Sequence, residues 1–484
     1  MTERVQIEAP DFSGAVVSRV RLAQDLGDQP HRKLILVIAP PGYGKTTFLA
    51  EFAQTSDRPV CWAQLSIDEK DPEHLHELLT QSLIRRFRRL KGKIPAGGSE
   101  APAANLGRAL AEHVPERHAL VLDDVQILRQ SPEATAYLES LRRSLPDQTT
   151  LILAGRSLPD LSLAALVAAD DVKSYGAVEL TLEFEEMREL VELRTGGEVA
   201  EDAAQELYRE TEGWITGVLL SPRLQPEFVT AGVGRSLVAE YFNEVAFAQE
   251  PAEIQQFLVD TAILPVFNAE LSDHALGRED SQSLIEQLLK SGSYLFREGY
   301  YPEPLFRYQR QFGQFLGSKD GSPEDHAETI TKRAAAWYQE HELPEYAFDL
   351  YMSVGDYEAA GKVADQWARP LYVRGFQSQI YDWAQRLTQV GAITPEVIRI
   401  HAVCEIYGQG NLGTTQEKLQ KAYQLALKDG DPSVRFRILS SQFLIYIEFG
   451  ANENPKQLLD EMREILPLCP ADYAGNFYTN LLSY

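Results

Sequence analysis

Short apolar runs, separated by longer stretches of mixed polarity, mark the first third of the chain. Four of these runs occupy residues 34–38, 59–65, 119–122 and 150–154. Continuous apolar runs of this length are typical of parallel strands that are buried beneath helices. The alternation of strand and helix from about residue 32 to 165 therefore predicts a parallel α/β layer.

Different patterns surround this layer. A short helix is predicted at residues 16–26, before the first strand. Residues 180–222 are predicted to be helical and acidic, and we interpret the charge run at 183–194 as a solvated helix face. Residues 235–320 contain helical patterns followed by a hairpin-like stretch at 294–301. This combination predicts a winged helix.

From about residue 327 onward the pattern is helical, with glycines between helix pairs. Gly410 and Gly450 are separated by the same interval as Leu419 and Leu459, about 40 residues. This period is typical of a helical repeat array of the tetratricopeptide type, with a plain helical bundle as the alternative. Repeat arrays normally end in a polar capping helix, whereas this chain ends in apolar and aromatic residues. We therefore expect the natural protein to continue beyond Tyr484.

The charge of the chain limits its partners. There are 46 Lys and Arg against 71 Asp and Glu, which gives a formal net charge of −25. Such an acidic chain repels phosphate backbones, so direct DNA binding by this segment is disfavoured. Nucleic-acid contact is one reading of the dense basic cluster at residues 85–93. We interpret the cluster instead as the C-terminal end of an amphipathic helix that Gly92 stops.

The composition also indicates a cellular environment. The three cysteines, Cys61, Cys404 and Cys469, are scattered and suggest neither disulfides nor a zinc site. The sequence contains no run of about 18 apolar residues, so no membrane span is predicted. The N-terminus lacks the pattern of a signal peptide. We therefore expect a cytoplasmic protein.

A glycine-containing loop joins the first apolar run to a helical pattern. Its residues are Ala39, Pro40, Pro41, Gly42, Tyr43, Gly44, Lys45, Thr46 and Thr47. In such a loop, backbone N–H groups wrap a β-phosphate, Lys45 reaches the β- and γ-phosphates, and the Thr46 hydroxyl binds Mg²⁺. Ala39 stands where the strict pattern has glycine, and a small residue is tolerated there. The loop predicts binding of ATP or ADP with Mg²⁺, with a purely structural glycine turn as the alternative.

Two acids, Asp123 and Asp124, end the third apolar run. The carboxyl ends of parallel strands share one edge of a sheet, so we expect both acids beside the glycine loop. Asp123 is the predicted partner of Mg²⁺, and Asp124 is predicted to polarise an attacking water. Asp is shorter than Glu, so we expect slow hydrolysis with Asp124 and Lys45 as the catalytic residues. A surface Asp pair that ends a core strand is the alternative.

Arg156 follows the fourth apolar run, after Gly155. An arginine at the end of this strand points toward the same edge of the sheet as the glycine loop. We predict that it senses the γ-phosphate, as in other P-loop switches. The alternative is an arginine that pairs with a nearby acid.

Several motifs, taken in this order, resemble those of the STAND signal-transduction ATPases, in particular the MalT-like branch of large LuxR-type transcriptional activators. The P-loop matches this family closely. The other motifs lie at residues 17–22 (an N-terminal strap), 62–71, 156–161, 211–214 and 333–360. Each motif is modest alone, but their shared order is specific and covers nearly the whole chain.

The resemblance implies roles for individual residues. Lys45, Thr46, Asp123 and Arg156 carry over as nucleotide and Mg²⁺ contacts. The resemblance also implies nucleotide contacts for three further residues, with Arg19 in the strap and the last two near the base or ribose: Arg19, Gly213 and Trp214. In the family, an ADP-bound closed monomer is the resting state, and an inducer together with ATP opens it for self-association.

Two departures from the family are visible. The family carries Tyr-His-His-Leu-Phe in the winged helix, where this chain has Gln309 and Arg310 at the two histidines. The interdomain lock to ADP is therefore expected to be weaker, or to be made by Arg310. The second departure is the effector, because no basic helix-turn-helix precedes Tyr484. DNA contact is expected only through a module outside this chain.

The predicted fold is a multidomain α/β plus α protein with a P-loop NTPase parallel sheet, a helical domain, a winged helix and tetratricopeptide-like repeats. The predicted boundaries are 1–170 for the P-loop domain with its strap, 171–234 for the helical domain, 235–322 for the winged helix, 323–400 for a helical arm and 401–484 for the repeats.

The predicted function is that of an ATP- and ADP-dependent switch of a MalT-like transcriptional regulator. It binds ATP with Mg²⁺, hydrolyses it slowly, and self-associates when an unknown inducer or protein partner binds the repeats. One alternative is a fast motor or transporter ATPase. Another is a nucleotide-stabilised repeat scaffold that binds a protein or peptide partner without a catalytic cycle.

Overall fold

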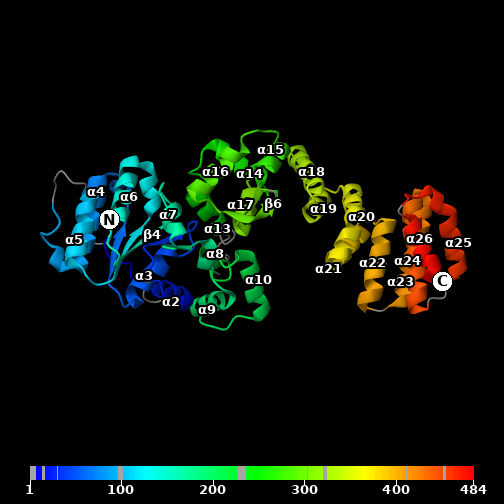
Figure 1. The fold of residues 1–484 in the computed structure, drawn as a ribbon, viewed down its shortest axis with the longest axis horizontal. Helices are drawn as coiled ribbons and strands as arrows, with labels where there is room; N and C mark the ends of the chain where they lie inside the picture. The colour runs from blue at the N-terminus through cyan, green and yellow to red at the C-terminus, as the bar shows by residue number, and fades with distance from the viewer. Residues whose placement is uncertain are drawn as a thin grey trace. The chain divides into compact units, whose positions relative to one another are not determined.

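The computed structural model describes the chain except for residues 1–6, 13–16, 30, 96–101, 226–235, 302, 320–323, 410, 451–453, 472 and 484. It separates into two compact units (Figure 1). Unit 1 comprises Met1–Ala269 and Asp280–Gly321, and unit 2 comprises Glu270–Glu279 and Ser322–Tyr484. No helix in the described ranges is both long enough and apolar enough to cross a membrane.

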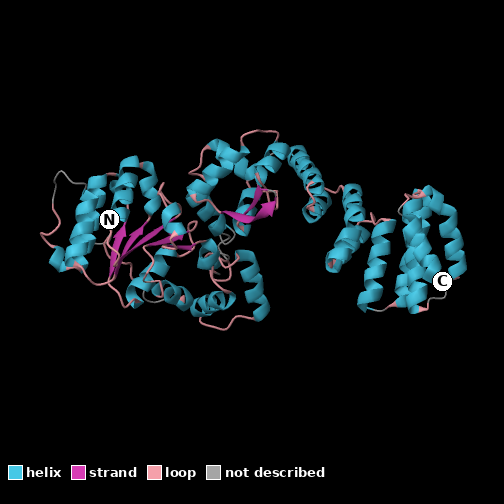
Figure 2. Ribbon diagram, in the orientation of Figure 1, coloured by secondary structure: helices cyan, strands magenta, loops and turns pink. Residues whose placement is uncertain are grey.

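Unit 1 contains a five-stranded parallel sheet (Figure 2). In chain order its strands are β1 (Leu34–Ile38), β2 (Val60–Gln64), β3 (His118–Asp123), β4 (Thr149–Gly155) and β5 (Val172–Tyr175). Their order in space is β2-β3-β4-β1-β5. The predicted parallel layer is thus confirmed, with β1 beside β4 at its centre.

Helices pack against both faces of this sheet. The helices of this region are α2 (Val20–Gly27), α3 (Lys45–Thr55), α4 (Pro72–Arg86), α5 (Pro102–His113), α6 (Pro132–Ser144) and α7 (Ala164–Ala168). Short 3₁₀ turns are η1 (Ile67–Lys70), η2 (Arg88–Leu90) and η3 (Val125–Gln130). One core cluster joins α4, α5 and α6 to alternate residues of the strands, among them Leu36, Leu120 and Leu153. These side chains are buried, as the continuous apolar runs require.

Strand β5 was not predicted and lies beyond residue 170, so the sheet extends past the boundary given above. It is an edge strand whose residues, Val172 to Tyr175, include two adjacent polar residues and form no apolar run. Pairing with the buried strand β1, rather than intrinsic pattern, places it in the sheet. Edge strands are only half covered and therefore leave a weak signal in sequence.

Two predicted helix ends need correction. Helix α2 begins at Val20, because residues 17–19 are not helical and Arg19 at the N-cap has non-helical dihedral angles. Val16, where the predicted helix starts, lies outside the described residues. Helix α4 ends at Arg86, well before Gly92. Phe87 and Leu90 turn into the core, and this burial converts the basic cluster into a short 3₁₀ turn.

The rest of unit 1 is a helical region and a winged helix. The first contains α8 (Ala177–Leu180), α9 (Phe184–Thr195), α10 (Glu201–Thr211) and α11 (Ile215–Leu219). The second contains α13 (Ser236–Phe242), the π-helical turn η4 (Asn243–Phe247), α14 (Ala252–Thr261), α16 (Ser281–Ser291), β6 (Leu295–Tyr301), β7 (Glu303–Tyr308) and α17 (Arg310–Gly317). Strands β6 and β7 pair antiparallel and form a hairpin. The stretch predicted to be hairpin-like, residues 294–301, contains only its first strand, because β6 runs to Tyr301 and the second strand begins at Glu303.

Unit 2 consists of helices. They are α15 (Ala269–Leu276), α18 (Glu324–Glu340), α19 (Pro344–Ser353), α20 (Tyr357–Arg374), α21 (Gln377–Gln389), α22 (Pro395–Gln409), α23 (Leu412–Asp429), α24 (Pro432–Phe449), α25 (Pro455–Ile465), the 3₁₀ turn η5 (Leu466–Leu468) and α26 (Tyr473–Ser483). Leu419 of α23 and Leu459 of α25 are both buried, each on the second helix of a pair. Gly450 ends α24 with a positive φ, whereas Gly410 lies outside the described residues.

Candidate functional site

The glycine loop connects the carboxyl end of β1 to the first turn of α3. Gly42 and Gly44 have φ of 80° and 71°, a backbone conformation that favours glycine. The amino end of α3 begins at Lys45, so its free N–H groups face the loop. The predicted strand–loop–helix arrangement is therefore present, and it is an anion cradle by its geometry.

Lys45 lies over the loop. Its Nζ donates to the carbonyl oxygens of Ala39 at 2.8 Å and Pro40 at 3.0 Å. Burial lowers the pKa of Lys45 to about 8, although the charges of Asp123 and Asp124 act in the opposite direction. A half-buried ammonium group at a P-loop is a suitable partner for a polyphosphate, whose negative charge would stabilise the charged lysine that burial disfavours.

Thr46 and Asp123 meet at the edge of the sheet. The Thr46 hydroxyl donates to Asp123 Oδ2 at 2.6 Å. Asp123 is 1% exposed, and burial, followed by the charge of Asp124, raises its pKa to about 6. A hydroxyl and a carboxylate oxygen at this separation form the type of donor pair that Mg²⁺ takes beside nucleotide phosphates. The residues present thus fit the predicted metal.

Asp124 is oriented by two carboxamides that the sequence reading missed. Its backbone is left-handed, with φ of 63°. Gln126 Nε2 donates to its Oδ1 at 3.0 Å, and Gln64 Nε2 donates to its Oδ2 at 3.3 Å. A glutamine at the end of β2 was a possible signal, because the carboxyl ends of neighbouring parallel strands meet.

Arg156 directly follows β4. Its backbone N–H donates to Gln126 Oε1 at 3.2 Å. Its positive charge contributes to lowering the pKa of Lys45, so the two cations share one electrostatic environment. The structure thus places Arg156 at the predicted edge of the sheet. Its role as a γ-phosphate sensor stays a prediction.

Arg19 lies behind the loop, in the strap before α2. Its guanidinium is 3% exposed and donates to the carbonyl oxygens of Gly44 and Leu180, both at 2.8 Å. Burial lowers the pKa of Arg19 to about 10, while nearby acids, Glu186 first, raise it. The strap therefore joins the end of the P-loop to α8 through one buried cation.

Gly213 and Trp214 lie between α10 and α11 of the helical region, and Trp214 contacts the loop. Gly213 has φ of 70°, and a Cβ there would lie 2.4 Å from the Leu182 carbonyl oxygen. Trp214 is fully buried and stacks on Phe242 with ring centroids 4.8 Å apart. Its indole N–H donates to the Pro41 carbonyl at 3.3 Å. Trp214 thus holds the loop backbone, whereas Gly213 packs on Leu182. Contact of either residue with a base or ribose stays a prediction.

Two further residues that the sequence reading missed also contact the loop. The backbone N–H and the hydroxyl of Thr216 both donate to the Gly42 carbonyl at 3.2 Å. From the winged helix, the hydroxyl of the buried residue Tyr294 donates to the Pro41 carbonyl at 2.9 Å. Three regions of unit 1 thus meet on two consecutive carbonyls, Pro41 and Gly42. No local motif signals these contacts.

A second contact joins the winged helix to β4. Arg129 of η3 donates to Ser157 Oγ at 3.2 Å and also to the Lys290 carbonyl at the end of α16. Gly292 packs so closely on Arg156 that a Cβ would lie 2.1 Å from the Arg156 carbonyl oxygen. The strand end that carries Arg156 is therefore in direct contact with the winged helix.

The two residues that replace the family histidines occupy different environments. Gln309 is fully buried, donates to the Thr211 carbonyl at 3.3 Å, and accepts from the Phe312 N–H at 2.9 Å, which caps α17. Arg310 is exposed and donates to the Arg209 carbonyl at 3.5 Å. The structure thus directs Arg310 to the end of α10, and its contact with ADP stays a prediction.

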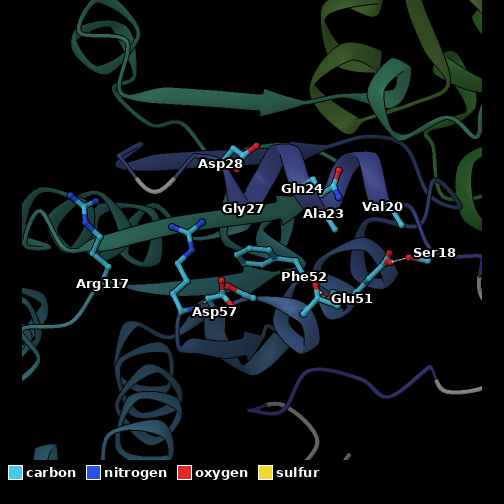
Figure 3. Close-up of a pocket in the computed structure, with 13 residues that line it drawn as sticks. Ser18, Val20, Ala23, Gln24, Gly27, Asp28, Glu51, Phe52, Asp57 and Arg117 are labelled. Carbon is cyan, nitrogen blue, oxygen red and sulfur yellow. Dashed lines mark hydrogen bonds between the residues drawn. The ribbon is translucent and has the colours of Figure 1, made fainter.

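A separate hollow of about 730 Å³ lies beside α2 and α3 (Figure 3). It is lined by residues of the strap and α2 between 18 and 28, by residues of α3 and the following turn between 51 and 58, and by Arg117, and it includes no residue of the P-loop. Arg58 and Arg117 precede β2 and β3, at the opposite edge of the sheet from Asp123. The hollow is therefore distinct from the candidate nucleotide site.

Two family models match the chain. The AAA domain matches residues 28–159, and the MalT winged helix domain matches residues 243–324. The first match covers the P-loop, both acids and Arg156. The second covers Tyr294 and Gln309. The family matches therefore contain the predicted P-loop residues and the winged-helix residues that meet around them.

Curated relatives agree with the family models. The HTH-type transcriptional regulator MalT of Cronobacter sakazakii is 24% identical over 356 residues, which span 70% of this chain and 39% of the relative. MalT of Klebsiella pneumoniae is 27% identical over 320 residues, which span 62% of this chain and 35% of the relative. The chain thus spans about two fifths of the length of these relatives.

A solved structure of a STAND protein with a tetratricopeptide repeat sensor, from Pyrococcus horikoshii, aligns with 98% of this chain and 68% of that chain, at 16% identity and a TM-score of 0.44. The two family models and the curated relatives together show that the chain is similar to MalT-like P-loop ATPases.

Proposed function

We propose that unit 1 is a nucleotide-dependent switch that binds ATP or ADP with Mg²⁺ and serves a MalT-like transcriptional regulator. The observation that carries the proposal is the Thr46–Asp123 pair, 2.6 Å apart, beneath a P-loop whose lysine is half-buried. The matches to the AAA domain and to MalT relatives support the same function. Binding of ATP with Mg²⁺ also explains why two carboxylates, Asp123 and Asp124, follow the otherwise apolar strand β3.

In this proposal, different residues contact different parts of the nucleotide and its metal. Loop N–H groups and the Lys45 ammonium bind phosphate oxygens, while Thr46 and Asp123 hold Mg²⁺. When bound, Mg²⁺ neutralises charge on the β- and γ-phosphates. Asp124 holds and polarises the attacking water, and Arg156 responds to the γ-phosphate. Because Asp124 is shorter than a glutamate at this position, we propose slow turnover that acts as a timer.

The switch follows from the contacts on Pro41 and Gly42. Trp214, Thr216 and Tyr294 bind these carbonyls only when the helical region and the winged helix lie against the loop. ATP and an inducer shift this equilibrium only if they bind the open arrangement more tightly than the closed one. We propose that ADP favours the closed arrangement, and that the open one self-associates.

The first experiment identifies the nucleotide. The purified protein is denatured, and the released nucleotide is separated by chromatography. Near-stoichiometric ADP supports a closed resting switch. Protein free of nucleotide, combined with no measurable binding of Mg²⁺-ATP by calorimetry, overturns the proposal.

A nucleotide-stabilised scaffold is the second candidate, because the helix pairs of unit 2 form a repeat-like series that suits a protein or peptide partner. Lys45→Ala separates the two candidates. A switch loses ATP-dependent self-association in this variant, whereas a scaffold keeps its assembly and partner binding unchanged.

A further inference from the structure

The Asp124 carboxylate is held on both of its oxygens. Gln126 Nε2 donates to Oδ1 at 3.0 Å and Gln64 Nε2 to Oδ2 at 3.3 Å, while the Asp124 N–H donates to Asp123 Oδ1 at 3.0 Å. A carboxylate with a donor on each oxygen has little rotational freedom, because a turn about its last bond breaks both hydrogen bonds. The direction of the remaining lone pairs is thus set by neighbouring side chains.

Gln126 has a second partner. Its Oε1 accepts from the Arg156 backbone N–H at 3.2 Å, while its Nε2 serves Asp124. Both ends of one carboxamide are engaged, so the orientation of the amide follows from the network. A single side chain therefore links the acid that follows β3 to the first residue after β4.

Gly155 provides the space for this link. A Cβ at Gly155 would lie 2.4 Å from Gln126 Oε1, closer than any real contact, with Val125 Cγ2 and the Gln126 backbone nitrogen at 3.2 and 3.3 Å. The backbone of Gly155 does not have a positive φ. The glycine is therefore required for the room that the carboxamide occupies, not for its backbone conformation.

We propose that Gln126 is a positioning residue for ATP hydrolysis, and this inference rests on the proposed function. In that reaction the water oxygen bonds to the γ-phosphorus, the bond to the bridging oxygen of ADP breaks, and the proton of the water leaves toward Asp124. Gln126 aims the Asp124 carboxylate at this water. Gln126 also links the orientation of the Asp124 carboxylate to the backbone of Arg156, so a displacement of the carboxyl end of β4 turns the carboxylate.

The test compares two glutamines of the same 3₁₀ turn. Gln126→Ala lowers kcat for ATP about tenfold, the effect of losing one hydrogen bond to a charged group, and leaves the Kd for Mg²⁺-ATP within about twofold. Gln130→Ala is the matched control, because Gln130 is exposed and pairs with Lys70. Equal kcat in the two variants, or a parallel loss of affinity in Gln126→Ala, overturns the inference.

The isosteric change Gln126→Glu sharpens the test. The variant keeps the acceptor for the Arg156 N–H but places a carboxylate against Asp124, so its kcat falls at least as far as that of Gln126→Ala. Wild-type kcat in Gln126→Glu overturns the positioning role, because shape alone would then suffice. Absence of hydrolysis by the wild type overturns the proposed function itself, a result distinct from failure at Gln126.

A double-mutant cycle gives a readout besides hydrolysis. Gly155→Ala expels the carboxamide, so it lowers both kcat and the temperature of unfolding in the wild type. In the Gln126→Ala background the same change has room, and we expect less than half of the shift in unfolding temperature. Equal shifts in the two backgrounds show that Gly155 does not act through Gln126 and overturn the proposed link.

Discussion

The P-loop region of unit 1 and the helix pairs of unit 2 are stabilised in different ways. At the loop, Arg19, Gly44, Trp214 and Tyr294 come together from distant parts of the sequence. In unit 2, successive helices pack mainly on their neighbours, and small separate clusters replace one continuous core. A surface assembled from distant segments can exist in two arrangements, whereas nearest-neighbour packing favours one.

Buried charges show the same contrast. Asp123 lies beside another acid, and its burial is not compensated by an adjacent cation strong enough to lower its pKa. In unit 2, burial alone would raise the pKa of Glu396, but hydrogen bonds and charges from Arg399 and Arg437 outweigh it and lower the pKa. The charge of the second carboxylate is compensated within the fold, whereas that of the first is not, and uncompensated buried carboxylates are typical of functional sites.

The largest expected effect on nucleotide affinity comes from removing Lys45, the cation of the P-loop. We expect Lys45→Ala to weaken Mg²⁺-ATP and ADP binding about 100-fold, because charge-assisted hydrogen bonds to phosphate are lost. Lys418→Ala in unit 2 is the control, since Lys418 pairs with Glu405 at 2.7 Å and touches no residue of the loop. Calorimetric titration measures both. Equal affinities in the two variants would contradict the site.

Matched glycines test the packing difference. Gly213 and Gly450 have nearly the same φ, 70° and 71°, but a Cβ at Gly213 meets the Leu182 backbone and one at Gly450 meets nothing within 4 Å. Gly213→Ala should destabilise unit 1 by about 3 kcal/mol, against about 1 kcal/mol for Gly450→Ala. Denaturant unfolding measures both, and similar losses would refute the role of close packing at Gly213.

The two buried acids should respond to pH with opposite sign. Because Asp123 binds its proton more tightly folded than unfolded, its contribution to stability falls as pH rises from about 4 to about 6. Glu396 stabilises above its unfolded pKa and loses this contribution as pH falls. At pH 7, Asp123→Asn should stabilise the ligand-free protein by about 2 kcal/mol and Glu396→Gln should destabilise it. Unfolding curves at pH 5 and 7 measure both differences.

Nucleotide affinity should have a related pH profile. Mg²⁺ binding requires a charged Asp123, and phosphate binding requires a charged Lys45. Their pKa values of about 6 and about 8 predict an affinity for Mg²⁺-ATP that is highest between these limits. Asp123→Asn should abolish the acid limb and keep the alkaline limb. Unchanged affinity from pH 5 to 9 would count against both assignments.

The smallest effect is expected at the contact between the winged helix and β4. Arg129→Ala removes the donors to Ser157 and to the Lys290 carbonyl, so ADP should dissociate about threefold faster, in line with the loss of exposed hydrogen bonds. Arg143→Ala, which removes an exposed pair with Glu139 inside α6, is the control. Stopped-flow release of a fluorescent ADP measures both rates.

Local pattern was sufficient for several parts of this protein. The glycine loop, Lys45 with Thr46, and the acids after β3 follow from short motifs, because phosphate and Mg²⁺ binding need particular residues at fixed spacing after an apolar strand. Continuous apolar runs likewise identified β1 to β4 and predicted that they pair in a parallel sheet. The hairpin of the winged helix and the helical character of unit 2 were equally local.

Only the tertiary structure decided which distant residues close around the loop. Thr216 and Tyr294 carry no motif, yet both donate to loop carbonyls, and Gln126 gains its position from the space above Gly155. Edge strand β5 depends on pairing with β1 rather than on its own residues. The physical reason is common to all of them. A periodic pattern reports how one segment is buried, whereas hydrogen bonds between segments depend on distances that exist only after the chain has folded.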